Sequence, residues 1–486
     1  MTHVAFTGRV LIIGCGSVAQ CVLPVLLAEI DLSPSQVTVF DFVDNQARIA
    51  DQIRAGVGFV HGRITEDNLD STLSELCGPG DICLDLAWNI DCNTILQWCR
   101  DHGVRYLNTS VEVWDPYEDA ANIHPLDRTL YRRHMELRRL IAGWPDNRGA
   151  SAVVEHGANP GLVSHWTKQA MRDLATRGLT EGVIESGSVR ALESALAARE
   201  YNQVARLLDV KVIHIAERDT QVTDRPKGEN EFVNTWSVDG LYEEGVAPAE
   251  LGWGTHERRM PVGAFQHSGE GPGNQLALAQ MGCKTWVRSR VPSGEIVGMI
   301  IRHGEAFTIT DRFTVWDGPT PVYRPTVHYA YCPSDSAIAS LHELEMRQYV
   351  MQDHQRILND EILPGGRDEL GVLLMGHPFK SWWTGSLLTI DDARALVPHQ
   401  NATTLQVAAS ILGAVVWMIR NPNEGVRVPD ELPWEEVLGV AKPYLGELWS
   451  GPLDWDPLST RFDVFSRYAH RDRDQSDPWQ FANFLV

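Results

Sequence analysis

Residues 10–19 read Val-Leu-Ile-Ile-Gly-Cys-Gly-Ser-Val-Ala, an apolar run that leads into the pattern G-x-G-x-x-A. The run predicts a short buried strand, and residues 17–28 follow it with the spacing of a helix. In such a unit Gly14 permits the tight turn, Gly16 lets a phosphate approach the backbone, and Ala19 lets helix and strand pack closely. The stretch therefore predicts a dinucleotide-binding site; glycines that serve only a turn are the alternative.

An acidic residue at the end of the next strand bears on the choice of cofactor. Asp41 follows the strand predicted over Val37–Phe40 and lies 25 residues after Gly16. A carboxylate there bonds the ribose hydroxyls and repels a 2′-phosphate, which favours NAD over NADP, although Asn45 and Arg48 follow closely. The predicted cofactor is NAD, and its predicted binding residues are Gly14, Gly16, Ser17, Val18 and Asp41.

Segments with strand and helix patterns alternate through the first 110 residues. After the first strand and helix they are Val37–Phe40, Asn45–Arg54, Gly58–His61, Asp81–Leu86, Thr94–His102 and Val104–Leu107. Alternation at this length predicts βαβ units and a parallel sheet. A polar helix near Leu126–Ile141 and a strand at Ala152–Glu155 continue the pattern. Residues 1–158 are therefore predicted to form a Rossmann-type domain of the α/β class.

The pattern changes from about Val212 to His328, where short strand-like runs alternate with Gly and Pro turns. This predicts an inserted α+β domain over residues 159–394 with a largely antiparallel sheet, which would carry the substrate site. Its predicted strands include Phe307–Val315, and a helix is predicted over Asp335–Ile357. Residues 395–486 are expected to complete the nucleotide domain.

The chain of 486 residues carries 42 Lys and Arg against 64 Asp and Glu, for a formal net charge of −22. Aromatic and branched residues occur throughout, which argues against disorder. No basic cluster offsets the acidity, which argues against nucleic-acid binding. The diffuse negative charge either attracts cationic small molecules or serves solubility.

Cysteine usage and the N-terminal residues predict a cytoplasmic protein. The eight cysteines form no CxxC pair, which is typical of reduced thiols, and the N-terminus lacks a basic region and an export cleavage site. The apolar stretch Ala402–Ile419 contains four polar residues, so a core helix explains it better than a membrane span. The histidines show no HExxH pattern, and no metal is predicted.

Seven residues outside the glycine-rich turn are candidates for chemistry. Asn159, in a strand-to-helix turn, could present its amide to a nicotinamide or an amine, or could cap the helix. Trp236 could face a cation or simply pack, and His303 could transfer protons or make structural hydrogen bonds. The carboxylates are candidates for amine binding or ordinary solvated surface, and spacing alone does not bring them together. They are Glu112, Glu217, Glu244 and Asp368.

Ten motifs in one order carry a family resemblance. They are IIGCGSVAQCVLP, NTSVEVW, EHGANPGLVSHW, IAERDTQ, NTWSVDGLYEEG, ELGWGTHE, IRHGE, DELGVLLMGHP, NATTLQVAASILGAVVWMI and PYLGELW. Together they resemble the bacterial homospermidine synthases, relatives of the saccharopine dehydrogenase and carboxynorspermidine dehydrogenase group. The extended tail after about Asp391 favours the synthase branch.

The resemblance implies a redox-neutral reaction on a held NAD. Two putrescine molecules would give homospermidine and ammonia through imine and 4-aminobutanal intermediates, with spermidine as an alternative donor, in an enzyme that is a homodimer through its inserted domain. The catalytic residues that the resemblance implies are Glu112, Asn159, Glu217, Trp236, Glu244, His303 and Asp368.

Two other functions stay open at this point. An imine reductase such as an NAD(P)-dependent carboxyspermidine dehydrogenase or a saccharopine reductase would need Arg or Lys to bind a substrate carboxylate. Four arginines keep that alternative open: Arg218, Arg258, Arg302 and Arg367. A polyamine or NAD sensor would bind without turnover, and nothing in the sequence favours it.

Overall fold

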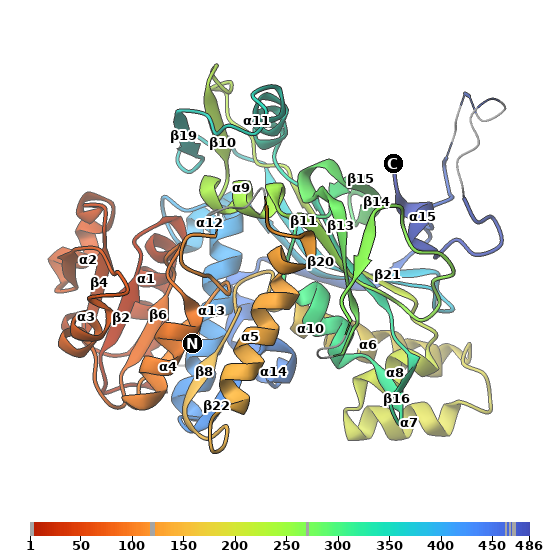
Figure 1. The fold of residues 1–486 in the computed structure, drawn as a ribbon, viewed down its shortest axis with the longest axis horizontal. Coiled ribbons are helices and arrows are strands. Elements are labelled where there is room, and N and C mark those ends of the chain that lie inside the picture. The colour runs from red at the N-terminus through yellow and green to blue at the C-terminus, as the bar shows by residue number, and fades with distance from the viewer. Residues whose placement is uncertain (1–3, 117–121, 269–271, 462–463, 466–467, 469–472) are drawn as a thin grey trace.

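The computed structural model describes residues 4–116, 122–268, 272–461, 464–465, 468 and 473–486. Its described residues form two large sheets (Figure 1), one in the N-terminal part, coloured red and orange, and one in the green and cyan part. The mixed α/β class expected from the sequence is confirmed.

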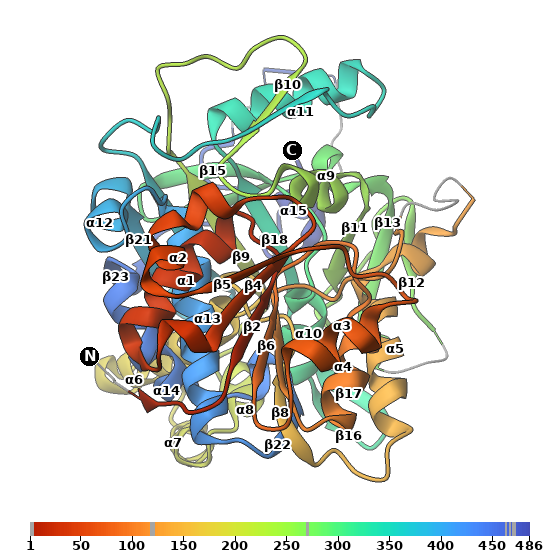
Figure 2. The ribbon, with the colours of Figure 1, turned by 90° about the vertical axis from the view of Figure 1, so that its left-hand side faces the viewer.

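The first sheet has seven parallel strands in the order β22-β8-β7-β6-β2-β4-β5. Its strands are β2 (Val10–Ile13), β4 (Val37–Asp41), β5 (Gly58–His61), β6 (Ile82–Asp85), β7 (Arg105–Asn108), β8 (Gly149–Val153) and β22 (Glu424–Arg427). The helices that alternate with them are α1 (Ser17–Glu29), α2 (Ala50–Ala55), α3 (Leu69–Leu76), α4 (Cys92–Asp101) and α5 (Leu130–Ala142). All four residues of β2 are buried, as a central strand covered on both faces requires (Figure 2).

The second sheet follows the order β12-β13-β11-β18-β9-β20-β21-β23, with β14 and β15 joined to it through β18. Its strands are β9 (Val212–Asp219), β11 (Pro248–Gly252), β12 (Ala264–Gln266), β13 (Gln275–Met281), β14 (Trp286–Val291), β15 (Gly294–Met299), β18 (Thr326–Cys332), β20 (Arg367–Met375), β21 (Ser381–Thr389) and β23 (Glu447–Leu453). Its strand pairs are antiparallel except for β9 and β18. The largely antiparallel sheet expected from the sequence is therefore confirmed.

Smaller elements surround the two sheets. The parallel pair β10 (Glu231–Asn234) and β19 (His354–Ile357), with α11 (Asp335–Met346), lies at the top of Figure 1, above α9 (Val238–Val246). The remaining elements are β1 (Val4–Ala5), β3 (Ile30–Asp31), β16 (Val315–Asp317), β17 (Thr320–Tyr323), α6 (Leu162–Glu181), α7 (Val189–Ala198), α8 (Tyr201–Leu207), α10 (Glu305–Arg312), α12 (Ile390–Leu396), α14 (Trp434–Ala441) and α15 (Phe481–Phe484).

Helix α13 (Ala402–Arg420) packs against elements of both sheets. It contacts α1 and α14 and also strands β7, β8, β20 and β21. The Asn401 side chain caps its N-terminus by accepting a hydrogen bond from the Thr404 amide at 2.8 Å. By length and composition this helix could cross a membrane, but it is almost wholly buried here. Burial within the fold accounts for its apolar composition.

Two predicted elements are wrong. Residues Phe307–Arg312 of the strand predicted over Phe307–Val315 belong to helix α10. The prediction failed because residues 305–310 are buried on every side and the alternating threonines imitate a strand pattern. The Thr310 hydroxyl bonds the Ala306 carbonyl at 2.6 Å, which satisfies it within the helix. The helix predicted over Asp335–Ile357 ends at Met346, and the residues from His354 form strand β19.

The C-terminal residues divide between the two sheets. Strand β22 pairs with β8 in the parallel sheet, whereas β23 pairs with β21 in the antiparallel sheet. Residues 395–486 therefore complete the nucleotide sheet only in part. Hydrophobic patterning did not predict which sheet each strand joins, because β22 pairs with a strand more than 250 residues before it and β23 with one at least 60 residues before it, and such pairing leaves no local signal.

Candidate active site

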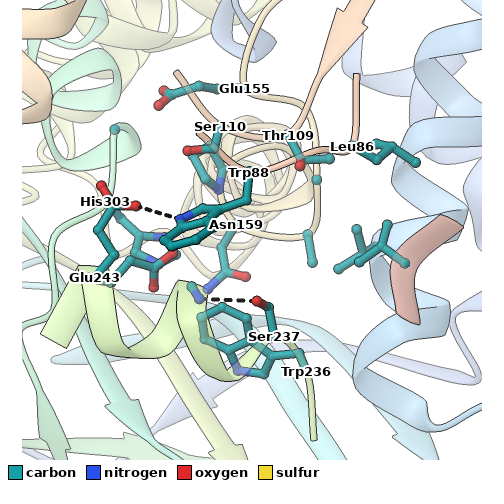
Figure 3. Close-up of a pocket in the computed structure, with 18 of the residues that line it drawn as sticks. Leu86, Trp88, Thr109, Ser110, Glu155, Asn159, Trp236, Ser237, Glu243 and His303 are labelled. Atoms are coloured by element: carbon teal, nitrogen blue, oxygen red, sulfur yellow. Dashed lines mark hydrogen bonds and ion pairs between the residues drawn. The ribbon is translucent and has the colours of Figure 1, made fainter. Parts of the chain in front are cut away.

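A cavity of about 200 Å³ is lined by residues of both halves of the chain (Figure 3). Six of the seven predicted catalytic residues line it: Glu112, Asn159, Glu217, Trp236, Glu244 and His303. Asp368 lies one layer behind the wall, where its carboxylate accepts a hydrogen bond from the cavity-lining Thr403 hydroxyl at 2.6 Å. Residues between 112 and 368 in the sequence are thus brought to one place.

The glycine-rich turn reaches the same cavity and fits a dinucleotide. Gly14 has φ +93°, and a Cβ there would lie 2.8 Å from the Leu86 carbonyl oxygen, so the tight turn requires glycine. A Cβ on Gly16 would meet nothing within 4 Å, which leaves room for a phosphate beside the N-terminus of α1. Val18, in the first turn of α1, lines the cavity. A dinucleotide on this turn would therefore reach the cavity with its far end.

Asp41 ends β4 beside that turn, as the sequence predicted. Its carboxylate accepts hydrogen bonds from the backbone amides of Cys15, at 2.5 Å, and Val43, at 2.8 Å. The buried carboxylate thus fixes the position of the turn, and it lies where an acid would contact the ribose of the dinucleotide. Ser17, also predicted here, is buried in the first turn of α1.

At one end of the cavity, buried carboxylates lie close together, and no cationic side chain among the described residues is bonded to Glu217 or Asp368. Glu217 on β9 accepts hydrogen bonds from the Tyr329 hydroxyl and, at 3.1 Å, from the Asn159 amide. Burial raises the pKa of Glu217 to about 8. Burial, Glu217 and Asp219 together raise the pKa of Asp368 well above its usual range. A cationic ligand bound at this end would therefore stabilise the ionised forms of Glu217 and Asp368.

Trp236 follows β10 at the same end of the cavity. Its indole nitrogen donates to the Tyr331 hydroxyl at 2.9 Å, which fixes the ring plane. Trp236 and Ser237 lie across the cavity from Thr109 and Ser110 (Figure 3). A fixed indole face beside carboxylates is a favourable place for an ammonium or iminium group.

His303 lies between two carboxylates. Its Nε2 is 3.0 Å from Glu244 and its Nδ1 is 3.2 Å from Glu305. Burial alone would lower the pKa of His303, but Glu305 and Glu244 outweigh burial and raise it well above its usual range. With an acceptor at each ring nitrogen, the imidazolium form is favoured. Burial raises the pKa of Glu244, so the two groups can exchange a proton.

At the other end of the cavity the carboxylates are balanced by arginines. Glu243 on α9 accepts a hydrogen bond from Arg133 at 2.8 Å and pairs with Arg302. Glu112 lies 3.9 Å from Arg133, and burial and Glu243 raise its pKa to about 7. The indole of Trp88 donates to Glu243 at 3.0 Å (Figure 3).

Sequence reasoning missed several residues of the wall. Glu155 lines the cavity with φ +60° and bonds His134 at 2.6 Å. It was predicted only as the last residue of a strand, although it begins the motif EHGANPGLVSHW, which could have marked it as a candidate. Trp88, Glu243 and Tyr329 were also missed, because the contacts that place them join residues more than 100 positions apart.

The arginines that kept a carboxylate-binding reductase open are all engaged. Of the four, only Arg302 lines the cavity, and Glu243 pairs with it. The others pair elsewhere: Arg218 with Asp335, Arg258 with Asp474 and Arg367 with Glu369. The geometry does not favour that alternative.

Comparison with known proteins gives a consistent result. The family model described as the saccharopine dehydrogenase NADP binding domain matches residues 10–153, and the saccharopine dehydrogenase C-terminal domain matches residues 157–451. The curated homospermidine synthase of Mesorhizobium japonicum is 39% identical over 99% of this chain and 96% of its own length. That of Blastochloris viridis is also 39% identical, over 99% of this chain and 97% of its own length.

A solved structure shows the same fold over the whole chain. The crystal structure of a homospermidine synthase from Legionella pneumophila, in complex with NAD, superposes with a TM-score of 0.88 at 36% identity. The match covers 100% of this chain and 99% of that chain. The resemblance found in the motifs is thereby confirmed, and the chain belongs to the homospermidine synthase family.

Proposed function

We propose that this protein converts two molecules of putrescine into homospermidine and ammonia with NAD as a cofactor that is restored in each cycle. One observation carries the proposal. The glycine-rich turn opens into a cavity where Glu217, with Asp368 behind it, and the face of Trp236 can bind a cation. NAD in the related Legionella structure supports the choice of cofactor.

Bound NAD would supply a hydride acceptor for the first amine carbon and the same hydride for the later imine. The residues of the cavity do the rest. Glu217, with Asp368 behind it, would bind the distal ammonium of a diamine, since carboxylates without cationic partners gain most from one. Asn159 would orient the reacting end, and Trp236 would stabilise the iminium charge by about 1–2 kcal/mol in a desolvated site.

Glu244 and His303 would handle the protons. The amine must lose a proton before hydride leaves, and water must add to the first imine so that ammonia can depart. Glu244 can accept a proton, and the His303 imidazolium can donate one at 3.0 Å from it. Glu112, which lines the cavity beside Arg133, would order water or amine. The atoms balance, because two diamines give one triamine and one ammonia.

The test supplies putrescine in excess and NAD⁺ at a small fraction of its concentration, and measures products by mass spectrometry. We expect homospermidine and ammonia in equal amounts, far exceeding the NAD⁺ added. NADH that accumulates with product, or product only after an amino acid and an aldehyde are supplied, would favour a reductase. Binding without turnover would favour a sensor. With spermidine as donor, 1,3-diaminopropane should replace ammonia.

We also propose that the protein is a cytoplasmic homodimer that acts without nucleic acid or a membrane. All eight cysteines are buried thiols, which suits a reducing compartment. Near the end of α11, Met346 and Val350 are 79% and 63% exposed, and this apolar surface supports a contact between copies. Light scattering of the purified protein tests the dimer, and fractionation of cells tests the location.

A further inference from the structure

Glu243 is held as a bound carboxylate would be held. One oxygen accepts a hydrogen bond from Arg133 at 2.8 Å and pairs with Arg302, while the other accepts the Trp88 indole N–H at 3.0 Å. Two guanidinium groups and an indole donor around one carboxylate form a complete anion site. The three donors come from α5, from the turn after β15 and from the loop after β6.

This anion site belongs to the cavity wall. Glu243, Arg302 and Trp88 all line the cavity, and the side chains of Glu243 and Arg302 are each 6% exposed. The arginines outweigh burial and hold the pKa of Glu243 below its usual range. Each guanidinium has one further carbonyl partner, Val111 for Arg133 at 2.8 Å and Arg128 for Arg302 at 3.0 Å. Glu112 is the other carboxylate near Arg133.

Whether Glu243 is present decides how the two arginines affect the binding of diamines and amino acids. Without it, Arg302 in the cavity wall and Arg133 behind it would repel a diamine and attract the carboxylate of an amino acid. With it, one of the two positive charges is neutralised, Glu112 lies 3.9 Å from Arg133, and the anion site is already filled. Glu243 therefore reduces the positive charge that would repel a diamine, and it also occupies the site where the carboxylate of a competing amino acid would bind.

We propose that Glu243 is an internal stand-in for a substrate carboxylate, which fills the arginine subsite and so selects diamines against amino acids. This inference rests on the proposed function, since it concerns the selectivity of that same cavity. It assigns Glu243 a specificity role, with Arg133 and Arg302 as the residues that would otherwise bind a carboxylate.

A matched residue elsewhere separates this role from a structural one. Glu231 on β10 is buried and also held by two arginines, Arg356 at 2.9 Å and Arg225 at 3.3 Å. It does not line the cavity. Glu231→Ala therefore removes an equivalent buried ion-pair partner without opening a site to the substrate.

The experiment measures binding to the NAD-loaded protein by calorimetry. Putrescine is compared with ornithine, which is putrescine with a carboxylate on one terminal carbon. For Glu243→Ala we expect ornithine to bind about tenfold or more tightly than it binds the wild type, and putrescine about tenfold more weakly. Added acetate should restore putrescine binding by refilling the subsite. Glu231→Ala should change neither affinity.

A second pair of variants keeps the proposal testable if Glu243→Ala does not fold. Glu243→Gln preserves the volume, so its carboxamide still occupies the subsite while one negative charge is lost. It should weaken putrescine binding as Glu243→Ala does, without a gain in affinity for ornithine. Glu243→Ala combined with Arg302→Gln removes one charge of each sign and should also not gain it. Unchanged putrescine binding in a folded Glu243→Gln protein, unchanged ornithine binding in a folded Glu243→Ala protein, or an equal change in Glu231→Ala, would overturn the proposal. Homospermidine formation by the wild type tests the proposed function separately.

Discussion

The two ends of the cavity hold their carboxylates in different ways. Around Glu217 and Asp368 the hydrogen-bond partners are hydroxyl groups and an amide, and burial raises the pKa values of both acids. Around Glu243 the partners are two arginines and an indole, and the pKa of this acid is lowered. All three acids are buried, so their partners make the difference.

This difference indicates what each end is for. A buried acid without a cationic partner is costly to ionise, and an incoming ammonium removes that cost. A buried acid already paired with arginine gains little from a ligand. We therefore expect substitutions at the first end to weaken catalysis and diamine binding, and those at the second end to change selectivity.

The largest expected effect is at His303, between the two ends. His303→Ala removes the imidazolium that Glu244 and Glu305 hold, and general acid–base transfer is worth on the order of 10³ in rate. We expect kcat for homospermidine formation to fall by about that factor, with putrescine affinity changed much less. His377→Ala is the control, because His377 is buried outside the cavity. A fall below about tenfold would remove His303 from the proton-transfer steps.

Trp236 tests whether the first end uses an aromatic face. Trp236→Ala should raise KM for putrescine about tenfold, because a desolvated cation–π contact is worth about 1–2 kcal/mol. Trp236→Phe should recover part of the loss. Trp434→Ala is a matched control, since the Trp434 indole also donates to a tyrosine hydroxyl, that of Tyr201, at 2.7 Å, outside this cavity. Equal effects of the two alanine variants would indicate lost packing instead.

The sequence predicted the nucleotide half better than the substrate half for a physical reason. The nucleotide-binding motif is local in the sequence: it consists of a strand, the turn at Gly14 and Gly16, and Asp41 at the end of the next strand. Patterning also predicted the parallel and antiparallel sheets. It failed at Phe307, where tertiary burial overrides a strand-like alternation, and in the C-terminal residues, which supply strands to both sheets.

The candidate residues depended on the family resemblance. Nothing in the spacing of Glu217, Trp236 and His303 shows that they share a cavity, because strand pairing over long distances brings them together. The resemblance also missed Trp88, Glu155 and Glu243. Glu155 and Glu243 lie within two of the matching motifs and Trp88 lies outside them, but only the packed structure shows all three in the wall.

The smallest expected effect, in pH dependence, has opposite signs for Glu217 at one end and Glu243 at the other. The folded pKa of Glu217, about 8, lies above the unfolded value of about 4.3, so the folded state binds the extra proton. Its contribution to stability is full below pH 4 and is lost as the pH rises through 8. The lowered pKa of Glu243 does the reverse, and its contribution is lost as the pH falls below the unfolded value.

Thermal unfolding without putrescine distinguishes these signs. Between pH 6 and pH 9 the wild type should lose about 2 °C more in Tm than Glu217→Gln, which carries no titrating group there. Putrescine should restore the difference, since the dication favours the ionised acid, and its stabilising effect should grow with pH across this range. Parallel Tm curves for the two proteins would mean that Glu217 is already ionised at pH 6. The two ends of the cavity would then not differ in the protonation of their acids, and diamine binding would have to depend on shape and on Trp236.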